Sequence, residues 1–177
     1  MKTQLLPSVH SYPAPVVLIG CGTVEEPNII TCSWFGTVCS EPPMVSVSIR
    51  KNRYSYKPVH ISGEFTANLP RSTDIEVVKY CGTKSGRDVD KFEALGLTPI
   101  PCPPLKSAPM IAECQLVLAC KVKHELELGT HQIFTAEVVA IHCGEERARK
   151  SQRPDPKPEE QIVYLDGKYW GLHRLEV

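Results

Sequence analysis

Short hydrophobic runs that alternate with polar residues predict that this 177-residue chain is built mainly from β-strands. The clearest strand covers residues 44–50, where Val45, Val47 and Ile49 alternate with polar residues. Because successive side chains of a strand point to opposite faces, one face should meet a core while the other presents hydroxyls and a cation. The continuous apolar run at residues 16–21 is typical of a central strand.

Further strands are expected at residues 28–35, 65–69, 113–123 and 131–143. In the run 113–123, one face carries the apolar residues Leu116, Leu118, Cys120 and Val122. Near the C-terminus, Asp166-Gly167 connects residues 162–165 to residues 168–172. This dipeptide favours the two-residue type I′ turn of a β-hairpin.

Short helices are expected between the strands, the first over residues 54–62. A capping box formed by Thr73 and Glu76 predicts that a second helix begins there and runs to about Cys81. Gly82 is placed to end this helix, because glycine readily adopts the left-handed conformation found at helix ends.

A third short helix is expected over residues 88–95, capped by Asp88 and ended by Gly96. The proline-rich residues 98–109 should be irregular, and the charged residues 144–160 should form an exposed loop. Many strands with few intervening helices favour a mainly β fold, an antiparallel, Greek-key-like β-barrel with short helical insertions. The length predicts a single domain over residues 1–177.

Composition and charge narrow the classes of function. Lys plus Arg equals Asp plus Glu at 20 each, which argues against a nucleic-acid binder. The chain has no apolar run of about 18 residues and no signal-peptide pattern at its start, so a cytoplasmic protein is expected. Eight cysteines show no C-x-x-C spacing, and we expect buried, reduced thiols and no metal site.

Residues 50–57 contain four cations and directly follow the strand with the polar Ser46 and Ser48 face. If Ser55 begins a helix, its hydroxyl and the free backbone N–H groups would attract a phosphate, with Arg50 adding a charged contact. The alternative is a solvated surface loop whose charges bind nothing.

Three other segments are candidates for ligand contacts. Residues 31–35 begin with small side chains that allow a planar ligand close to the backbone; the alternative is a strand end with Trp34 in the core. The Gly- and Ser-rich residues 81–88 carry two cations and could cradle an anion, although they do not fit a P-loop. His131, at the mouth of a strand, is a candidate acid, base or anion ligand, or else a structural residue.

Taken in order, these segments resemble the flavin reductase-like, FMN-binding split-barrel family, which includes the flavoredoxins. The segments that carry the resemblance are residues 28–35, 42–50, 63–69, 85–92 and 129–138, together with the hairpin at Asp166-Gly167. The likeness extends from about Tyr12 to about His173, nearly the whole chain. It implies a split β-barrel, an FMN cofactor, and a homodimer with FMN near the interface.

The resemblance also implies a role for individual residues. His131 corresponds to a family histidine associated with nicotinamide binding or hydride transfer, and Cys32 stands where alanine is common. The isoalloxazine ring would lie against the backbone of Thr31, Cys32, Ser33 and Trp34. Ser48, Ile49 and Arg50 would line the ribityl chain and phosphate, with Ser55, Tyr56, Asn68, Ser85, Gly86 and Lys91 completing the site.

Three functions remain open from the sequence. The first is an NAD(P)H-dependent FMN oxidoreductase, in which NADH or NADPH meets the flavin face, since the chain has no G-x-G-x-x-G fingerprint. The second is a flavoredoxin-type carrier with tightly bound FMN and a redox partner protein. The third is a non-enzymatic split barrel that binds another ligand, such as heme.

Overall fold

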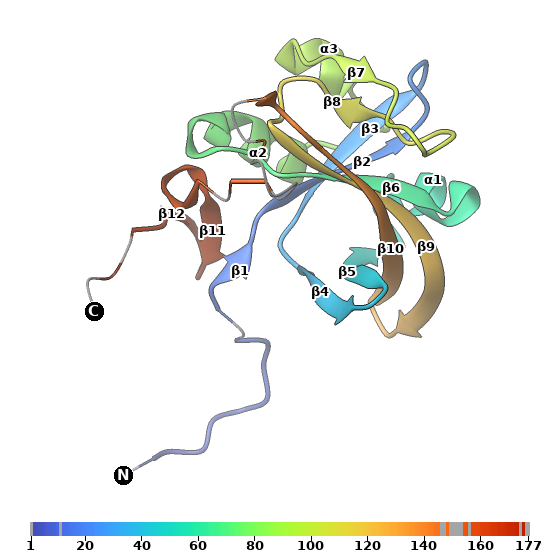
Figure 1. The fold of residues 1–177 in the computed structure, drawn as a ribbon. Coiled ribbons are helices and arrows are strands. Elements are labelled where there is room, and N and C mark those ends of the chain that lie inside the picture. The colour runs from blue at the N-terminus through green and yellow to red at the C-terminus, as the bar shows by residue number, and fades with distance from the viewer. Residues whose placement is uncertain are drawn as a thin grey trace.

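A curved, seven-stranded antiparallel sheet forms the centre of the molecule (Figure 1), with strand order β3-β2-β6-β9-β10-β5-β4. The computed structural model describes residues 2–10, 12–145, 148, 154–155, 157–173 and 175. The strands are β2 (Val17–Gly22), β3 (Pro27–Cys32), β4 (Phe35–Ser40), β5 (Pro43–Arg50), β6 (Glu64–Asn68), β9 (Leu116–Leu128) and β10 (His131–Cys143). The predicted mainly β fold with an antiparallel barrel-like sheet is confirmed.

The barrel is split between β3 and β4, which follow each other in the chain but lie at opposite ends of the strand order. Ser33 and Trp34 cross this opening, and the backbone N–H of Ser48 donates a hydrogen bond of 3.0 Å to the carbonyl of Trp34. The prediction of one strand over residues 28–35 was therefore wrong. The backbone changes partners after Cys32, because β3 pairs with β2 whereas β4 pairs with β5.

Alternation along β5 is as predicted and separates the core from the polar face. Val45, Val47 and Ile49 are buried, whereas Ser48 is half-buried and Arg50 is exposed. The buried side chains meet those of β2, β6 and β10, including Phe65 and Phe134. This core holds β5 in place, so its polar face is presented at a fixed position beside the split.

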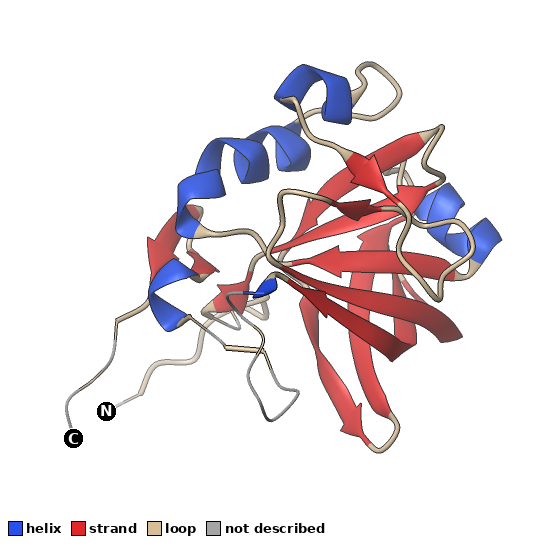
Figure 2. Ribbon diagram, turned by 45° about the horizontal axis from the view of Figure 1, so that its top comes forward, coloured by secondary structure: helices blue, strands red, loops and turns tan. Residues whose placement is uncertain are grey.

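Three α-helices lie around the outside of the sheet (Figure 2): α1 (Tyr56–Ser62), α2 (Ile75–Thr83) and α3 (Lys91–Leu95). The second helix differs from the prediction, because it follows a 3-10 turn, η1 (Ser72–Asp74), in which Asp74 accepts from the Arg71 backbone N–H at 2.8 Å. Gly82 does not end it. The helix continues to Thr83, and at Gly82 an added Cβ would lie 3.4 Å from Thr31 of β3.

The third helix begins later than predicted. Asp90, not Asp88, caps it by accepting from the backbone N–H groups of Phe92 and Glu93, and Gly96 ends it at a φ of 63° as expected. None of the helices in the described part of the chain is long and apolar enough to cross a membrane.

Strand β9 begins at Leu116 and extends to Leu128, so the prediction of residues 113–123 placed it too early. Both faces of its first half are buried, since Val117 and Ala119 pack against the proline-rich segment while Cys120 faces the main core. That segment is largely irregular as predicted, apart from the short pair β7 (Pro99–Ile100) and β8 (Met110–Ile111).

The C-terminal hairpin forms a second sheet, order β1-β11-β12, from β1 (Ala14–Pro15), β11 (Ile162–Leu165) and β12 (Lys168–Gly171). Asp166 and Gly167 have φ values of 47° and 77°, which confirms the type I′ turn. Ile162 is buried in a cluster with Val78 of α2, so the hairpin is held against that helix. A turn η3 (Pro158–Glu160) precedes it, and much of the predicted loop at residues 144–160 lies outside the described residues.

Candidate functional site

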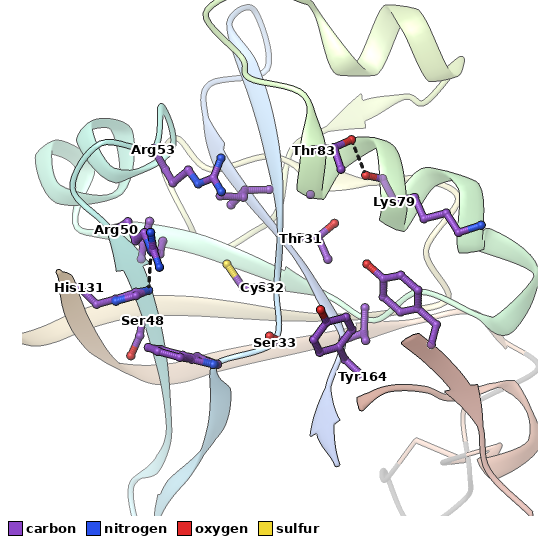
Figure 3. A pocket seen from close by; sticks show the side chains of 16 residues that line it. Thr31, Cys32, Ser33, Ser48, Arg50, Arg53, Lys79, Thr83, His131 and Tyr164 are labelled. Carbon is purple, nitrogen blue, oxygen red and sulfur yellow. Dashed lines mark hydrogen bonds between the residues drawn. The ribbon is translucent and has the colours of Figure 1, made fainter. Parts of the chain in front are cut away.

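A cavity of about 550 Å³, which we call the main cavity, lies at the split of the barrel (Figure 3). Its walls come from the crossing between β3 and β4, the end of β5, the first residue of β10, helix α2 and the C-terminal hairpin. Eight of the predicted site residues line it: Thr31, Cys32, Ser33, Trp34, Ser48, Ile49, Arg50 and His131. Its volume lies within the range of cavities that bind small molecules and cofactors.

The lining is cationic and rich in hydrogen-bonding groups. Arg50, Arg53 and Lys79 line the cavity, and among the described residues that line it none is Asp or Glu. Strand β3 is an edge strand of its sheet, and its last residues, Ile30, Thr31 and Cys32, line the cavity on the side that no neighbouring strand covers. Such a lining suits a flat ligand with polar ring edges and a negative charge.

His131, Arg50 and Trp34 form a connected group in the lining of the main cavity, and Figure 3 shows Arg50 beside His131 at one side of it. Arg50 and His131 are directly opposite each other in the β5–β10 pairing, and Arg50 Nε donates to His131 Nε2 at 3.4 Å. The indole of Trp34 lies against the imidazole with ring centroids 4.3 Å apart. The imidazole is therefore oriented by contacts from the end of β5 and from the crossing between β3 and β4.

The protonation state of His131 follows from these contacts. A guanidinium has no acceptor, so His131 Nε2 must accept, which leaves Nδ1–H to donate to the Thr130 hydroxyl at 2.8 Å. Burial lowers the pKa of His131, and the nearby positive charge of Arg50 lowers it further. The neutral imidazole is therefore the form that faces the cavity near pH 7.

A smaller cavity of about 130 Å³ adjoins the main cavity, and Ile30, Arg53 and Gly82 line both. It contains four more of the predicted site residues, Ser55, Ser85, Gly86 and Lys91. Lys84 and Arg87 add to its positive charge, and none of the described residues that line it is acidic. The cationic residues 50–57 and the Gly- and Ser-rich residues 81–88 thus meet at this second cavity, as a phosphate site would require.

Glycine at position 86 lets these two segments approach closely. A Cβ added there would collide with the Asn28 side chain and would lie 2.7 Å from the Tyr54 ring. Asn28 is buried and its Nδ2 donates to the Ser55 hydroxyl at 2.6 Å. Asn28 therefore links β3, the start of α1 and the loop that contains Gly86.

Lys91 contributes its charge from beneath the smaller cavity. Its side chain is buried, and Nζ donates to the carbonyls of Ile29 at 2.6 Å and Cys81 at 3.1 Å. Burial lowers the pKa of Lys91. The lysine thus joins β3 and α2, and its cation lies among groups of the site instead of in bulk water.

Cys32 presents a neutral thiol to the main cavity. Burial raises its pKa to about 12, so the thiolate that acts as a nucleophile is scarce near pH 7. Among the described residues, no group of three or more His, Cys, Asp or Glu side chains lies close enough together to hold a metal ion. The chemistry of this site therefore does not come from a reactive cysteine.

Two of the predicted site residues line neither cavity. The Asn68 side chain is buried, donates to the Leu18 carbonyl at 3.0 Å, and accepts from the Ile111 backbone N–H at 3.0 Å. Tyr56 stacks on His60 and lies against Phe134 of the core. Both side chains therefore join elements of the fold at some distance from the ligand-sized space.

Sequence reasoning missed the wall built by α2 and the C-terminal hairpin. Lys79, Thr83, Tyr164 and Tyr169 line the main cavity, but nothing in their local sequence marks them as site residues. Arg53 belongs to the cationic residues 50–57, which were predicted to attract a phosphate, but it was not predicted to be a site residue. Two tyrosines flanking a predicted hairpin turn were the only available signal for this wall.

Nearly the whole chain is similar to a known protein family. Residues 9–173 match the model of the flavin reductase like domain. The chain belongs to the flavin reductase-like family. The matched range contains both cavities and all of the site residues described above.

Individual relatives agree with this assignment. An uncharacterized protein of Archaeoglobus fulgidus is 35% identical over 146 residues, which are 82% of this chain and 80% of the relative. The reductase component of a 4-nitrophenol 4-monooxygenase/4-nitrocatechol 2-monooxygenase from Rhodococcus opacus is 26% identical over 81% of this chain and 73% of its own. The structure of flavoredoxin from Desulfovibrio vulgaris (Miyazaki F) superposes with a TM-score of 0.88 at 30% identity, covering 100% of this chain and 96% of that one.

Proposed function

We propose that this family member binds FMN across the two adjoining cavities and transfers electrons from NADH or NADPH to an acceptor. The observation that carries the proposal is the pairing of a ring-sized main cavity with a smaller, strongly cationic cavity directly beside it. A flat ring system joined to a phosphate has two parts that match these cavities in size, a large ring with polar edges and a small anionic group. The free carboxylates that would repel a phosphate are missing from both linings within the described residues.

Each cavity holds one part of the cofactor in this proposal. The ring lies against the edge of β3 and the crossing at Ser33 and Trp34, where backbone N–H and C=O groups meet its polar edge. Ser48 and Arg50 contact the ribityl chain. Arg53 stands where both cavities meet, and the phosphate lies beyond it among Ser55, Ser85, Lys84 and Arg87, the residues of the smaller cavity with hydroxyls or cations.

The protein supplies position and electrostatics, while bound FMN supplies the redox chemistry of accepting two electrons from the donor and returning them to the acceptor. In this proposal His131 contacts the donor on the open side of the flavin ring. The imidazole of His131 is neutral and lies against Trp34. Arg50 and Thr130 fix its orientation through one nitrogen each. No nucleophile–base pair is needed for this division of labour.

The test begins with the visible spectrum of the freshly purified protein, followed by release and identification of any cofactor. The apoprotein is then titrated with FMN, and the loaded protein is mixed with NADH or NADPH in a stopped-flow instrument. The proposal expects FMN to be bound and its absorption band to bleach with at least one donor. A colourless protein that takes up no added FMN would refute it.

A flavoredoxin-type electron carrier is the second candidate. The observation that favours it is the 30% identity and full-length superposition with a flavoredoxin. The same experiment separates the two functions. Tightly retained FMN that neither nicotinamide reduces, but that an electron-donor protein does reduce, supports the carrier.

We also propose that the protein acts as a homodimer with the FMN site near the interface. A row of exposed apolar side chains lies beside the main cavity, with Trp34 43%, Leu126 56% and Leu128 52% exposed. Leu128 is paired with His131 and Leu126 with Ile133 on the same face of the sheet. A second copy covering this row would exclude water from the flavin, and sedimentation equilibrium of the loaded protein tests whether the dimer exists.

A further inference from the structure

A third cavity is a groove of about 630 Å³ between helix α2 and the C-terminal hairpin, and we call it the hairpin groove. Its lining consists of Ile75, Lys79 and Thr83 of α2 together with Tyr164, Gly167, Lys168 and Tyr169 of the hairpin. The two elements are held together by the buried cluster that contains Val78 and Ile162. The groove is therefore part of the folded domain and has a fixed position relative to the main cavity.

The hairpin groove opens directly into the main cavity. Lys79, Thr83, Tyr164 and Tyr169 line both spaces. Figure 3 shows Lys79 and Thr83 on α2 across the main cavity from Arg50 and His131, with Tyr164 below them. A molecule that reaches the ring site from this side therefore passes between the lysine and the tyrosines.

The chemistry of the hairpin groove suits an anion that carries flat rings. Lys79 and Lys168 supply two cations, and none of the described residues in its lining is acidic. Lys79 forms an ion pair of 2.9 Å with Glu76, but both side chains are largely exposed, so a ligand can replace this contact at small cost. The rings of Tyr164 and Tyr169 meet edge to face with centroids 5.4 Å apart and offer apolar surface beside the two charges.

The phenol of Tyr169 remains a hydrogen-bond donor in this setting. Burial raises its pKa, the neighbouring Tyr164 raises it further, and Lys79 acts in the opposite direction. The protonated hydroxyl can therefore donate to a phosphate oxygen at neutral pH.

We propose that the hairpin groove binds the phosphate-bearing part of a nicotinamide dinucleotide donor. Lys79 and Lys168 contact the phosphates of the donor, and Tyr164 and Tyr169 contact its adenine base. This proposal rests on the proposed function, because it assumes that FMN fills the main and smaller cavities. The reducing ring then lies over the flavin near His131, and the remainder of the dinucleotide extends along α2. The smaller cavity is reserved for the FMN phosphate, so the donor's phosphates need a separate cationic surface, which the hairpin groove offers.

The experiment compares two donors that share the reducing ring and differ in phosphate. NADH carries the pyrophosphate, whereas 1-benzyl-1,4-dihydronicotinamide carries none. The FMN-loaded protein and the variants Lys79→Ala, Lys168→Ala and the double variant are reduced by each donor in a stopped-flow instrument. Lys106→Ala, a change at an exposed lysine outside all three cavities, is the matched control.

The double variant should raise the apparent Kd for NADH by about tenfold or more, the size expected for lost charged contacts. In Lys168→Ala, whose lysine lines the hairpin groove but not the main cavity, the limiting reduction rate, the FMN affinity and the reaction with the phosphate-free donor should stay within about twofold of the parent protein. Each single variant should show part of the effect, and Lys106→Ala none.

Four results would overturn the inference, and they are distinguishable. An unchanged Kd for NADH would mean that the donor's phosphates lie elsewhere. An equal loss with both donors would mean that the lysines act on the flavin site or the fold. FMN binding without reduction by NADH or NADPH would rule out a nicotinamide donor but would leave the proposal of FMN binding intact. Failure to bind FMN would refute the proposed function as well.

Discussion

At the scale of single residues, Arg50 is the cation whose position the fold specifies most directly. It ends β5, faces His131 across the β5–β10 pairing, and lines the main cavity. Arg50→Ala should weaken FMN binding by about 1.5–3 kcal/mol, the scale of a hydrogen bond to a charged group. Fluorescence titration of the apoprotein with FMN measures this change, with Lys106→Ala as the control. Unchanged affinity would mean that Arg50 does not contact the ribityl chain of the cofactor.

His131 should matter more for the reaction than for cofactor binding. His131→Ala is expected to slow reduction by the donor by about tenfold or more, the rate equivalent of one lost hydrogen bond, while FMN affinity changes less. Because burial and Arg50 lower its pKa, the imidazole takes up a proton only below its ordinary value near 6.5. A step in the reduction rate at such a pH should therefore appear in the parent protein and vanish in His131→Ala. Equal losses of binding and rate would instead identify a structural residue.

At the scale of elements, the loop between α2 and α3 depends on close contact with the turn before α1. Gly86→Ala should disrupt this contact, because the added Cβ meets Asn28 and lies 2.7 Å from the Tyr54 ring. Asn28 is also the partner of the Ser55 hydroxyl, so the smaller cavity should be distorted. We expect FMN affinity to fall by about tenfold or more while the domain remains folded.

The matched control for this prediction is Gly36→Ala in β4, where an added Cβ has nothing within 4 Å. It should leave FMN affinity and the thermal midpoint almost unchanged. If Gly86→Ala binds FMN as tightly as the parent protein, the phosphate does not occupy the smaller cavity.

The elements that sequence reasoning placed well are those with a strong local pattern. The alternation of β5 and the Asp166-Gly167 turn were both confirmed, since side-chain period and turn chemistry act within a few residues. The break after Cys32 could not be seen, because it arises when the chain leaves one edge of the sheet and joins the other. A change of pairing partner leaves no mark on local hydrophobicity.

The same distinction applies to the site. Residues next to a strong strand pattern, such as Ser48 and Arg50, line the main cavity. Lys79 comes from a helix and Tyr164 and Tyr169 from a hairpin about half the chain away, and only tertiary packing brings them together. Asn68 was assigned to the site through the resemblance, yet its amide joins β2, β6 and β8.

At the scale of the whole molecule, the split of the barrel creates the site. Closing the sheet would pair β3 with β4, the strands at its two ends, and would use up the outer backbone groups of β3 beside the main cavity. The crossing at Ser33 and Trp34, helix α2 and the hairpin instead surround the opening without filling it. The split of the barrel therefore provides both the polar backbone edge and the space for a flat ligand.

The buried thiols give the whole molecule a predictable response to alkaline pH. Burial raises the pKa of six cysteines, to about 11 for Cys81 and Cys102 and to about 12 for Cys32, Cys114 and Cys120, with Cys21 shifted in the same direction. In the unfolded chain these thiols ionise near their ordinary value of about 8.5. Above that pH the unfolded state therefore holds fewer protons than the folded state.

Stability should consequently be full below about pH 8.5 and should fall as the pH rises towards 11 or 12. Each thiol that is ionised only in the unfolded state contributes a slope of up to about 1.4 kcal/mol per pH unit. Lys91 opposes this trend, because its lowered pKa means that the unfolded state binds the extra proton in that range, but it is one group against six. Urea unfolding at pH 8 and pH 10, under reducing and anaerobic conditions, should show a clear fall in the midpoint.

Two variants connect this fall to the buried thiols rather than to general alkaline damage. Cys120→Ala removes one fully buried thiol, so the free energy of unfolding should fall less steeply with pH by the contribution of one thiol. The variant should also be less stable at every pH, because it leaves a small cavity. Cys143→Ala removes an exposed thiol and should leave the slope unchanged. A midpoint that stays constant between pH 8 and pH 10 would mean that water reaches these thiols in the folded protein, and that the core around β2, β6 and β9 is looser than its packing indicates.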